Sequence, residues 1–521
     1  MEPWRSGSGW LSIEHLLRAH ARRDAARTAL FDVDKGERIC FGDLALVVEG
    51  VALQLRSHGV SQGARVVLLI DSSIETVVVW LALWRLAAVV CPFDISQIGA
   101  ASTQAAFRTL KPLLVLHGQR IGAPDLQTDV APCVRFGQWP VSPSEVASIR
   151  LLPASGREPP LGEGAQPHDV AAACCTSGSG GRMKIVLHDH ASYWLNGLAS
   201  THLLGLVPKD HLLEYRSLSW YSPQILSLMP FLQTGLALHL ARQFSAKRFP
   251  EWIEHQGITV CSGVPTVLNI LLSQPMQRLR ECATSLRVMT SSSAPLAART
   301  WQRFERESGI CIINLYGSSE CGWMCGNRLD DRRVGTVGRP VPGMAIDVVD
   351  ASGRSCAPGE PGELVVEGEK LALGMLQADG RLQPIRGQRF FTRDLACRDE
   401  DGFVRLLGRM DDLVIRGGVK ISPSEIEDVL LTHVDVSEAA AVGVPDPIYG
   451  QEAICFVVLR ENASADAESL RQFAGDALPR EKRPRAVVVI DTLPRNARGK
   501  LRRDVLRHRW QDALADRETG R

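Results

Sequence analysis

The residues best suited to chemistry form a glycine-rich run at positions 176–184. The run follows the apolar segment Val170–Cys175, as a loop that leaves a strand would. Glycines permit a positive φ, so successive backbone N–H groups can point inward at phosphate oxygens, and hydroxyls and a lysine supplement these donors. The candidate phosphate-binding residues are therefore Thr176, Ser177, Gly178, Ser179, Gly180 and Lys184.

This run departs from two common phosphate-binding loops. In a Walker loop a Ser or Thr follows the lysine, but here Lys184 is followed by Ile185. In a dinucleotide fingerprint a glycine stands three residues after the second glycine, but here Met183 stands three residues after Gly180. Taken alone, the run could equally be an exposed flexible loop.

A second polar cluster follows the apolar residues 312–315, so it too should leave the end of a strand. It comprises Tyr316, Gly317, Ser318, Ser319 and Glu320. A carboxylate beside hydroxyls at a strand end suits magnesium and a triphosphate. Weaker signals follow along the chain, in the order Thr392-Arg393-Asp394, Gly408-Arg409, Gly417-Gly418 and Pro494–Lys500.

Alternating helical and strand patterns should position these residues. Arg65–Ile70 is predicted as a strand, Ile74–Leu86 as a helix and Ala88–Pro92 as a strand, a rhythm that indicates a parallel sheet covered by helices. From Gly343 onward, short strands separated by Gly and Pro turns indicate a small antiparallel barrel or sheet.

The pattern changes again near position 409. The remaining residues predict an α+β unit with a helix at Pro423–Leu431, for which Ser422 is a plausible cap. The expected fold is therefore a large N-terminal α/β domain over 1–408 with parallel sheets and a small β-barrel. A hinge at 409–411 and a small mobile α+β domain over 412–521 complete it.

Composition excludes several classes of protein. The 521 residues exceed what one core usually organises, and a net charge of +1 gives no nucleic-acid footprint. The thirteen cysteines contain no Cys-x-x-Cys pair and indicate buried thiols in a reducing compartment. Met1–Arg5 precedes no apolar run, and the apolar stretch Val77–Phe93 is too short to span a bilayer. A cytoplasmic protein without membrane or nucleic-acid partners is expected.

Together, these motifs resemble the adenylate-forming superfamily, which contains acyl-CoA and aryl-CoA ligases, peptide-synthetase adenylation domains and firefly-type luciferases. The resemblance covers essentially the whole chain, including Gly335–Gly343 and Gly362–Leu364. It implies ATP-dependent activation of a carboxylate to an acyl-AMP, followed by transfer of the acyl group to the thiol of coenzyme A. The implied cofactors are ATP or acyl-AMP, coenzyme A and, if adenylation occurs, Mg²⁺.

The resemblance also implies roles for individual residues. Tyr316, Gly317, Ser318 and Ser293 would surround the nucleotide, Ser319 would contact the α-phosphate and Glu320 would hold magnesium. Asp394 would accept the ribose hydroxyls with help from Arg409. Lys500 would bridge the substrate carboxylate and the α-phosphate. Asp411 matches the hinge, and Gly417 and Gly418 would line the pantetheine tunnel.

Several positions depart from the family pattern. Family members commonly have Thr or Ser at Gly181, Pro at Met183, Gly at Ile185 and Gly at Arg393, and Ser291–Ser293 replaces a glycine-containing motif. Loss of one hydroxyl to an ionic phosphate costs about 1.5–3 kcal/mol. These changes affect triphosphate handling more than thioester formation, so we expect adenylation to be slow or absent. Lys500 argues for the alternative, a complete two-step ligase.

The family's acyl pocket matches Leu218–Pro223, Ser262–Val264 and Ser292–Ala294. Trp220 and Tyr221 offer aromatic surface there, and Gly263 is expected to leave volume. These segments contain no basic residue that could pair a second carboxylate, which favours a bulky hydrophobic monocarboxylic acid.

Other interpretations stay open. The chain could be a stand-alone adenylation enzyme that loads a carrier protein, or a non-catalytic acyl-adenylate binding protein. A homodimer is also open. His188 and His190 follow the glycine-rich run, and we expect His190 to be a satisfied core histidine.

Overall fold

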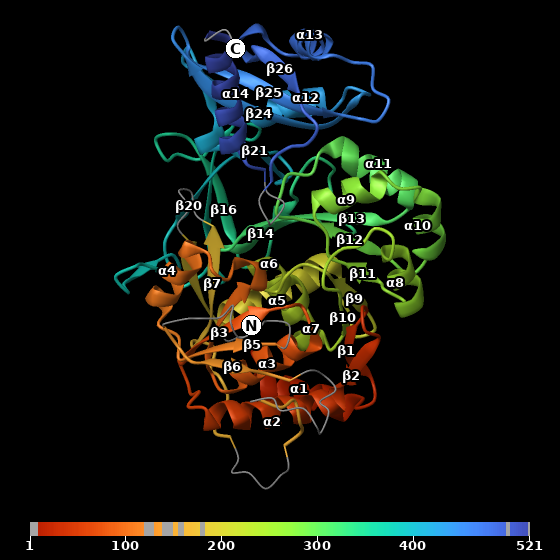
Figure 1. Ribbon diagram of the computed structural model, residues 1–521, viewed down its shortest axis with the longest axis vertical. Helices are drawn as coiled ribbons and strands as arrows, with labels where there is room; N and C mark the ends of the chain where they lie inside the picture. The colour runs from red at the N-terminus through yellow and green to blue at the C-terminus, as the bar shows by residue number, and fades with distance from the viewer. Residues whose placement is uncertain are drawn as a thin grey trace.

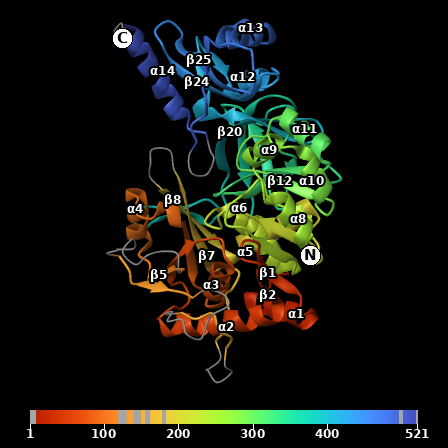
Figure 2. The ribbon, with the colours of Figure 1, turned by 45° about the vertical axis from the view of Figure 1, so that its right-hand side comes forward.

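The computed structural model describes residues 9–118, 130–137, 149–154, 161–177, 183–495 and 501–518. It contains a large N-terminal α/β part and a smaller C-terminal α+β part, which is drawn in blue at one end of the molecule (Figures 1 and 2). The predicted fold class is therefore confirmed.

One large sheet carries the first residues of the second predicted polar cluster, Tyr316–Ser318. Its pairings are parallel from β1 across to β13 and antiparallel at both margins. Its strand order is β15 (Arg339–Pro340), β14 (Gly322–Gly326), β13 (Cys311–Ser318), β12 (Val288–Ser291), β11 (Val260–Cys261), β9 (His211–Glu214), β10 (Ala237–Leu240), β1 (Thr28–Asp32) and β2 (Glu37–Cys40).

A second large sheet carries the strands on either side of the glycine-rich run. Its order is β19 (Leu382–Pro384), β18 (Gly374–Leu376), β8 (Met183–Asp189), β7 (Val170–Ser177), β4 (Val89–Asp94), β3 (Arg65–Ile70), β5 (Leu114–His117) and β6 (Cys133–Arg135). β3 and β4 pair in parallel, as the predicted β-α-β rhythm requires, whereas β7 and β8 are antiparallel.

Helices cover these sheets and fill the space between them (Figure 1). They are α1 (Ile13–Arg23), α2 (Phe41–Ser57), α3 (Ile74–Arg85), α4 (Ala101–Leu110), α5 (His190–Leu204), α6 (Tyr221–Pro223), α7 (Met229–Thr234), α8 (Phe249–Gln256), α9 (Pro265–Leu272), α10 (Met276–Cys282) and α11 (Ala298–Ser308). A π-helical turn at Gln224–Leu228 joins α6 to α7.

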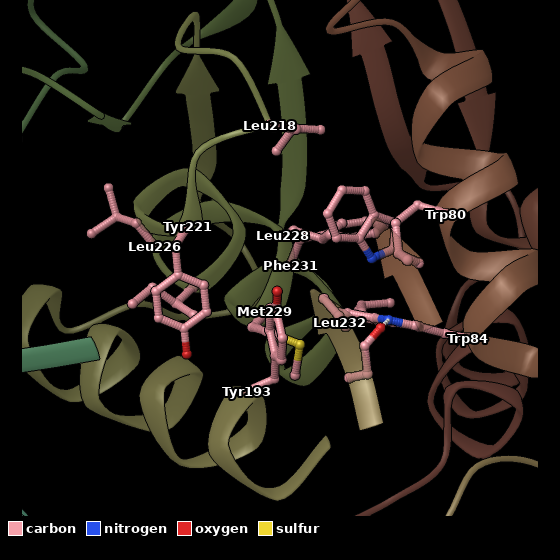
Figure 3. Packing of buried hydrophobic residues seen from close by; sticks show 14 of the residues in the cluster. Trp80, Trp84, Tyr193, Leu218, Tyr221, Leu226, Leu228, Met229, Phe231 and Leu232 are labelled. Atoms are coloured by element: carbon pink, nitrogen blue, oxygen red, sulfur yellow. Dashed lines mark hydrogen bonds between the residues drawn. The ribbon is translucent and has the colours of Figure 1, made fainter. Parts of the chain in front are cut away.

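The most apolar stretch of the chain is a core helix that runs into a strand, as predicted. Every residue of α3 is buried. In Figure 3, Trp80 and Trp84 project from α3 toward the helices that carry Tyr193 and Phe231, and the Trp84 and Tyr193 rings meet edge to face at 5.1 Å. Among the described residues, no helix has the length and apolarity needed to cross a membrane.

The predicted small β unit is an antiparallel sheet of β16 (Ala345–Val349), β17 (Gly362–Glu367), β20 (Phe390–Arg398) and β21 (Val404–Arg409). β16 and β21 are its edge strands. The β20–β21 pairing places Asp394 opposite Arg409. The predicted hinge at 409–411 spans the last residue of β21 and the start of a 3-10 turn at Met410–Asp412, which contains Asp411.

The C-terminal part has hydrophobic clusters of its own, between Val414 and Leu506. Its elements are β22 (Val414–Arg416), β23 (Val419–Ile421), α12 (Pro423–Leu430), β24 (Val436–Asp446), β25 (Gly450–Leu459), α13 (Ala467–Ala477), β26 (Ala486–Val489) and α14 (Arg503–Glu518). Ser422 stands at the predicted N-cap of α12, but its side chain does not cap the helix. Its hydroxyl donates instead to the backbone carbonyl of Leu407.

Candidate nucleotide and acyl site

Three of the predicted nucleotide-binding side chains lie together between β13, β20 and β21. The Tyr316 hydroxyl donates a hydrogen bond to the Asp394 carboxylate. The guanidinium of Arg409 lies 3.2 Å from the other oxygen of the same carboxylate. Burial, reinforced by the charge of Asp394, raises the pKa of Tyr316 well above 10, so the phenol remains a donor at neutral pH.

The two predicted phosphate-binding clusters also meet. Lys184 at the start of β8 lies 3.5 Å from Glu320, which follows β13. Thr176 on β7 pairs with Lys184 across the sheet, and the Ser318 hydroxyl accepts a hydrogen bond from the N–H of Cys321. Ser177 ends β7. Gly178, Ser179, Gly180 and Lys500 lie outside the described residues.

His188 joins these clusters, although we did not predict a role for it. Its ring lies 2.8 Å, through Nε2, from the backbone carbonyl of Ser319, and it stacks on the Tyr221 ring at 4.0 Å. Complete burial lowers the pKa of His188 to about 3, so the ring is neutral and Nε2–H is the donor to Ser319. His188 therefore connects the predicted α-phosphate contact to the predicted acyl pocket.

His190 is a buried packing residue, as predicted, but it is not satisfied. It begins α5 and packs edge to face on Trp84, while Asp189 caps the helix by accepting from the N–H of Ser192. Within the described part of the chain, no hydrogen-bond partner reaches its buried Nε2 atom. Burial lowers the pKa of His190 to about 4.

Two residues at glycine-type positions adopt a left-handed backbone. Arg393 has φ +63° and Ser293 has φ +70°, the conformation that L-residues avoid. The Arg393 guanidinium lies 2.7 Å from Asp411 on the predicted hinge, and both side chains are more than half exposed. The residue that replaces the family's glycine is thus paired with the hinge carboxylate.

The predicted tunnel glycines have a local structural requirement. Gly417 and Gly418, between β22 and β23, have φ values of +54° and +87°. The N–H of Gly417 donates to the carbonyl of Tyr449 at 2.8 Å. The left-handed turn alone explains why side chains are absent here.

The segments predicted to line the acyl pocket lie close together, but the prediction for Gly263 is wrong. Tyr221 is buried and Trp220 is half-buried. Gly263 leaves no volume, contrary to expectation, because a Cβ at this position would lie 2.3 Å from the carbonyl oxygen of Thr290. The glycine permits close approach of two strand ends rather than room for a ligand.

Sequence reasoning also missed a cation beside these segments. Arg216 is buried, and its Nη1 atom lies 3.4 Å from the Ser292 hydroxyl and 3.5 Å from the Ser222 hydroxyl. It is paired with Glu214 at 2.7 Å. Burial alone would raise the pKa of Glu214, but Arg216 and two serine hydroxyls outweigh burial and hold that pKa below its ordinary value.

Comparison with known protein families identifies the chain. A family model described as AMP-binding enzyme matches residues 17–376, and one described as AMP-binding enzyme C-terminal domain matches residues 425–500. The chain belongs to the AMP-binding enzyme family. It is an acid–thiol ligase of the adenylate-forming superfamily, in the CoA-ligase branch.

Two relatives of this AMP-binding enzyme match nearly its whole length. It is 30% identical to a sulfoacetate–CoA ligase of Cupriavidus necator, over 94% of this chain and 96% of that protein. It is 27% identical to an indoleacetate–CoA ligase of Aromatoleum aromaticum, over 95% of this chain and 98% of that protein.

Solved structures agree with the fold. ATP-bound MatB from Rhodopseudomonas palustris matches with a TM-score of 0.82 and 26% identity, over 96% of this chain and all of that one. The anthranilate CoA ligase AuaEII in complex with anthranoyl-AMP matches with a TM-score of 0.84 over 97% and 98% of the two chains. At 24% identity, the second comparison shows the fold alone.

The donor set of this AMP-binding enzyme suits Mg²⁺ held jointly with a nucleotide. Within the described part of the chain, no three His, Cys, Asp or Glu side chains form a metal-binding group. Mg²⁺ is typically held by one or two carboxylates together with substrate phosphates and water. Glu320 would supply such a carboxylate, and the bound ion would neutralise phosphate charge.

Proposed function

We propose that this chain forms the CoA thioester of a bulky, largely apolar monocarboxylic acid through an acyl-AMP, and that adenylation is its slower half-reaction. One observation supports this proposal above all. The cluster of Tyr316, Asp394 and Arg409, which would hold the adenosine, is assembled. The departures at Gly181, Met183 and Ile185 affect the segment that would hold the β- and γ-phosphates, whereas those at Arg393 and in the serine motif lie on the adenosine side and leave this cluster intact.

The two half-reactions make different demands on this site. In adenylation, a substrate carboxylate oxygen attacks the α-phosphorus and pyrophosphate leaves, so three charged phosphates must be held. In thioester formation, the CoA thiol loses its proton, its sulfur attacks the acyl carbonyl and AMP leaves. This second step requires the adenylate and CoA but neither the β- nor the γ-phosphate, and the adenosine cluster would hold the nucleoside of the adenylate.

Ile185, where family members commonly have glycine, lies on β8 shortly after the phosphate loop. Ile185 is buried in the hydrophobic cluster that also contains Cys175 and Leu376. It therefore ties β8 into the sheet, where glycine would leave the backbone free. A complete two-step ligase is the second candidate, because Lys184 and Glu320 are both retained and lie 3.5 Å apart.

The class of acid is proposed from the aromatic surface that Tyr221 and His188 form. Tyr221 is 4% exposed and stacks on His188, so a flat apolar acyl group would find a buried aromatic surface near Ser319. The relatives' names include sulfoacetate, 2-succinylbenzoate and indoleacetate, which span small polar to aromatic acids. Of these acids, indoleacetate agrees best with a buried aromatic surface.

The test measures the two half-reactions separately. Pyrophosphate release from ATP is compared with CoA-thioester formation from the corresponding synthetic acyl-AMP. Glu320→Gln should abolish residual pyrophosphate release and leave thioester formation within about threefold, because the adenylate lacks the phosphates that Glu320 would help to hold. Faster transfer to a phosphopantetheinyl carrier protein than to CoA would refute the CoA-ligase assignment, as would tight adenylate binding without turnover.

A further inference from the structure

A buried ion pair contacts all the segments assigned to the acyl pocket. Glu214, at the end of β9, is 1% exposed and Arg216 is 4% exposed. The Arg216 Nε atom donates to Oε1 of Glu214 at 2.9 Å, and Nη2 donates to Oε2 at 2.7 Å. This two-point geometry is the strong form of an arginine–carboxylate pair.

Serine hydroxyls link the pair to its surroundings. Ser262, from the second acyl segment, donates to Glu214 at 2.7 Å, and Ser227, from the π-helical turn, donates at 2.6 Å. On the other side, Arg216 Nη1 contacts Ser222 from the first acyl segment and Ser292 from the third. The charged pair is therefore part of the acyl site rather than of the distant core.

The guanidinium nitrogen Nη1 is poorly satisfied. It is the one nitrogen of Arg216 that Glu214 does not engage, and its contacts of 3.4 Å and 3.5 Å lie beyond good hydrogen-bond distance. Both partners are hydroxyls, which can rotate away to other acceptors. A well-placed acceptor on a ligand would make the shorter bond that the serines do not make.

We propose that the acid substrate carries a neutral hydrogen-bond acceptor on its apolar body, remote from the reacting carboxylate, and that Arg216 Nη1 donates to it. The inference rests on the proposed function and narrows its substrate class. A ketone, amide or ring heteroatom would meet this requirement. Arg216 is then a specificity-determining residue of the acyl site.

The acceptor is neutral because Glu214 already cancels the charge of Arg216. A second carboxylate on the acid would be desolvated next to a pair whose net charge is zero, which leaves its own charge uncompensated. Glu214 would also repel it. An apolar group at the far end of the acid, in contrast, would cover Arg216 Nη1 without accepting a hydrogen bond from it.

The test uses sets of acids that, at each chain length, differ only at the far end of the ring. We would compare adenylates of benzoate, phenylacetate and 3-phenylpropionate that carry a para acetyl, isopropyl or carboxylate group, which are similar in shape. At the chain length that fits, thioester formation with CoA should show kcat/KM at least tenfold higher for acetyl than for isopropyl, with carboxylate also below acetyl.

A charge variant makes the test specific to the pair. Glu214→Gln keeps the shape and leaves the Arg216 charge uncancelled, so the carboxylate-to-acetyl ratio of kcat/KM should rise at least tenfold. Ser227→Ala is the matched control, because it removes one hydrogen bond to Glu214 without changing the charge, and its ratio should stay that of the wild type. Thermal unfolding would confirm that each variant is folded.

The outcomes separate the inference from the proposed function. Equal kcat/KM values for acetyl and isopropyl at every chain length would overturn the inference, whether or not Glu214→Gln folds. An unchanged ratio in folded Glu214→Gln would overturn it as well. Failure to form thioester from any of the adenylates would instead overturn the proposed function.

Discussion

Position 393 allows the free-energy cost of a side chain in the left-handed conformation to be measured, because Arg393 can be replaced by glycine and by alanine. Its φ of +63° costs an L-residue about 1–2 kcal/mol, which glycine avoids and alanine does not. Glycine returns roughly 0.4–1 kcal/mol of this through greater freedom in the unfolded chain. We therefore expect Arg393→Gly to be more stable than Arg393→Ala by about 0.8 kcal/mol at the middle of the two ranges, and by up to about 1.6 kcal/mol.

The comparison is internally controlled, because both variants lose the ion pair with Asp411 and its contribution cancels. Equilibrium urea unfolding, with the midpoint converted through a common slope, would measure the difference in the free energy of unfolding. If Arg393→Ala were as stable as Arg393→Gly, the left-handed conformation of this residue would be refuted.

The same two variants report on the hinge. The Arg393–Asp411 ion pair is exposed, and such pairs contribute about 0.2–1 kcal/mol, or a factor of at most about five in a rate. A change in thioester formation shared by both variants would be the contribution of the pair to the domain rotation that the predicted hinge implies. A change beyond tenfold would show that Arg393 has a direct role in binding.

Three further predictions follow from buried groups. Gly263→Ala should destabilise the fold by about 1–3 kcal/mol through overlap with a strand backbone, whereas Gly162→Ala, in open space, should not; equal urea midpoints would contradict this. His188 and His190 have pKa values of about 3 and 4 against an ordinary 6.5, so their stabilisation is complete above pH 6.5 and is lost below it. At pH 5.5, each histidine should lower the free energy of unfolding by about 1.4 kcal/mol. When this free energy is measured by urea unfolding at several pH values, His188→Asn should remove the part of the pH dependence that is due to His188. Tyr316→Phe removes the hydrogen bond to Asp394, the carboxylate predicted to bind the ribose, and should weaken AMP binding about two- to tenfold by calorimetry, whereas unchanged affinity would place adenosine elsewhere.

Elements dominated by local pattern could be predicted from the sequence. The strand predicted at Arg65–Ile70 and the helix predicted at Ile74–Leu86 agree with β3 and α3, because continuous apolar runs between turn residues leave few alternatives. The antiparallel sheet after Gly343 could likewise be predicted, because its short strands are separated by Gly and Pro. The family resemblance assigned both Tyr316 and Asp394 to the nucleotide, and the structure shows that the two side chains are hydrogen-bonded.

Contacts that depend on tertiary packing could not be predicted in this way. Arg216 lies outside the acyl segments in sequence, and packing of β9 against β11 and the chain after β12 brings it to Ser292. The sequence signal that could have revealed Arg216 was its position two residues after Glu214, at the end of a strand. Gly263 was misjudged because volume at a glycine depends on what faces it, here the Thr290 carbonyl.

The most direct test of the central claim compares two rates on one acid. The first is pyrophosphate release from ATP with that acid, and the second is CoA-thioester formation from its synthetic adenylate. Because one lost phosphate contact costs about 1.5–3 kcal/mol, we predict that the second rate exceeds the first at least tenfold. ATP–pyrophosphate exchange as fast as thioester formation would contradict the account and establish a complete two-step ligase.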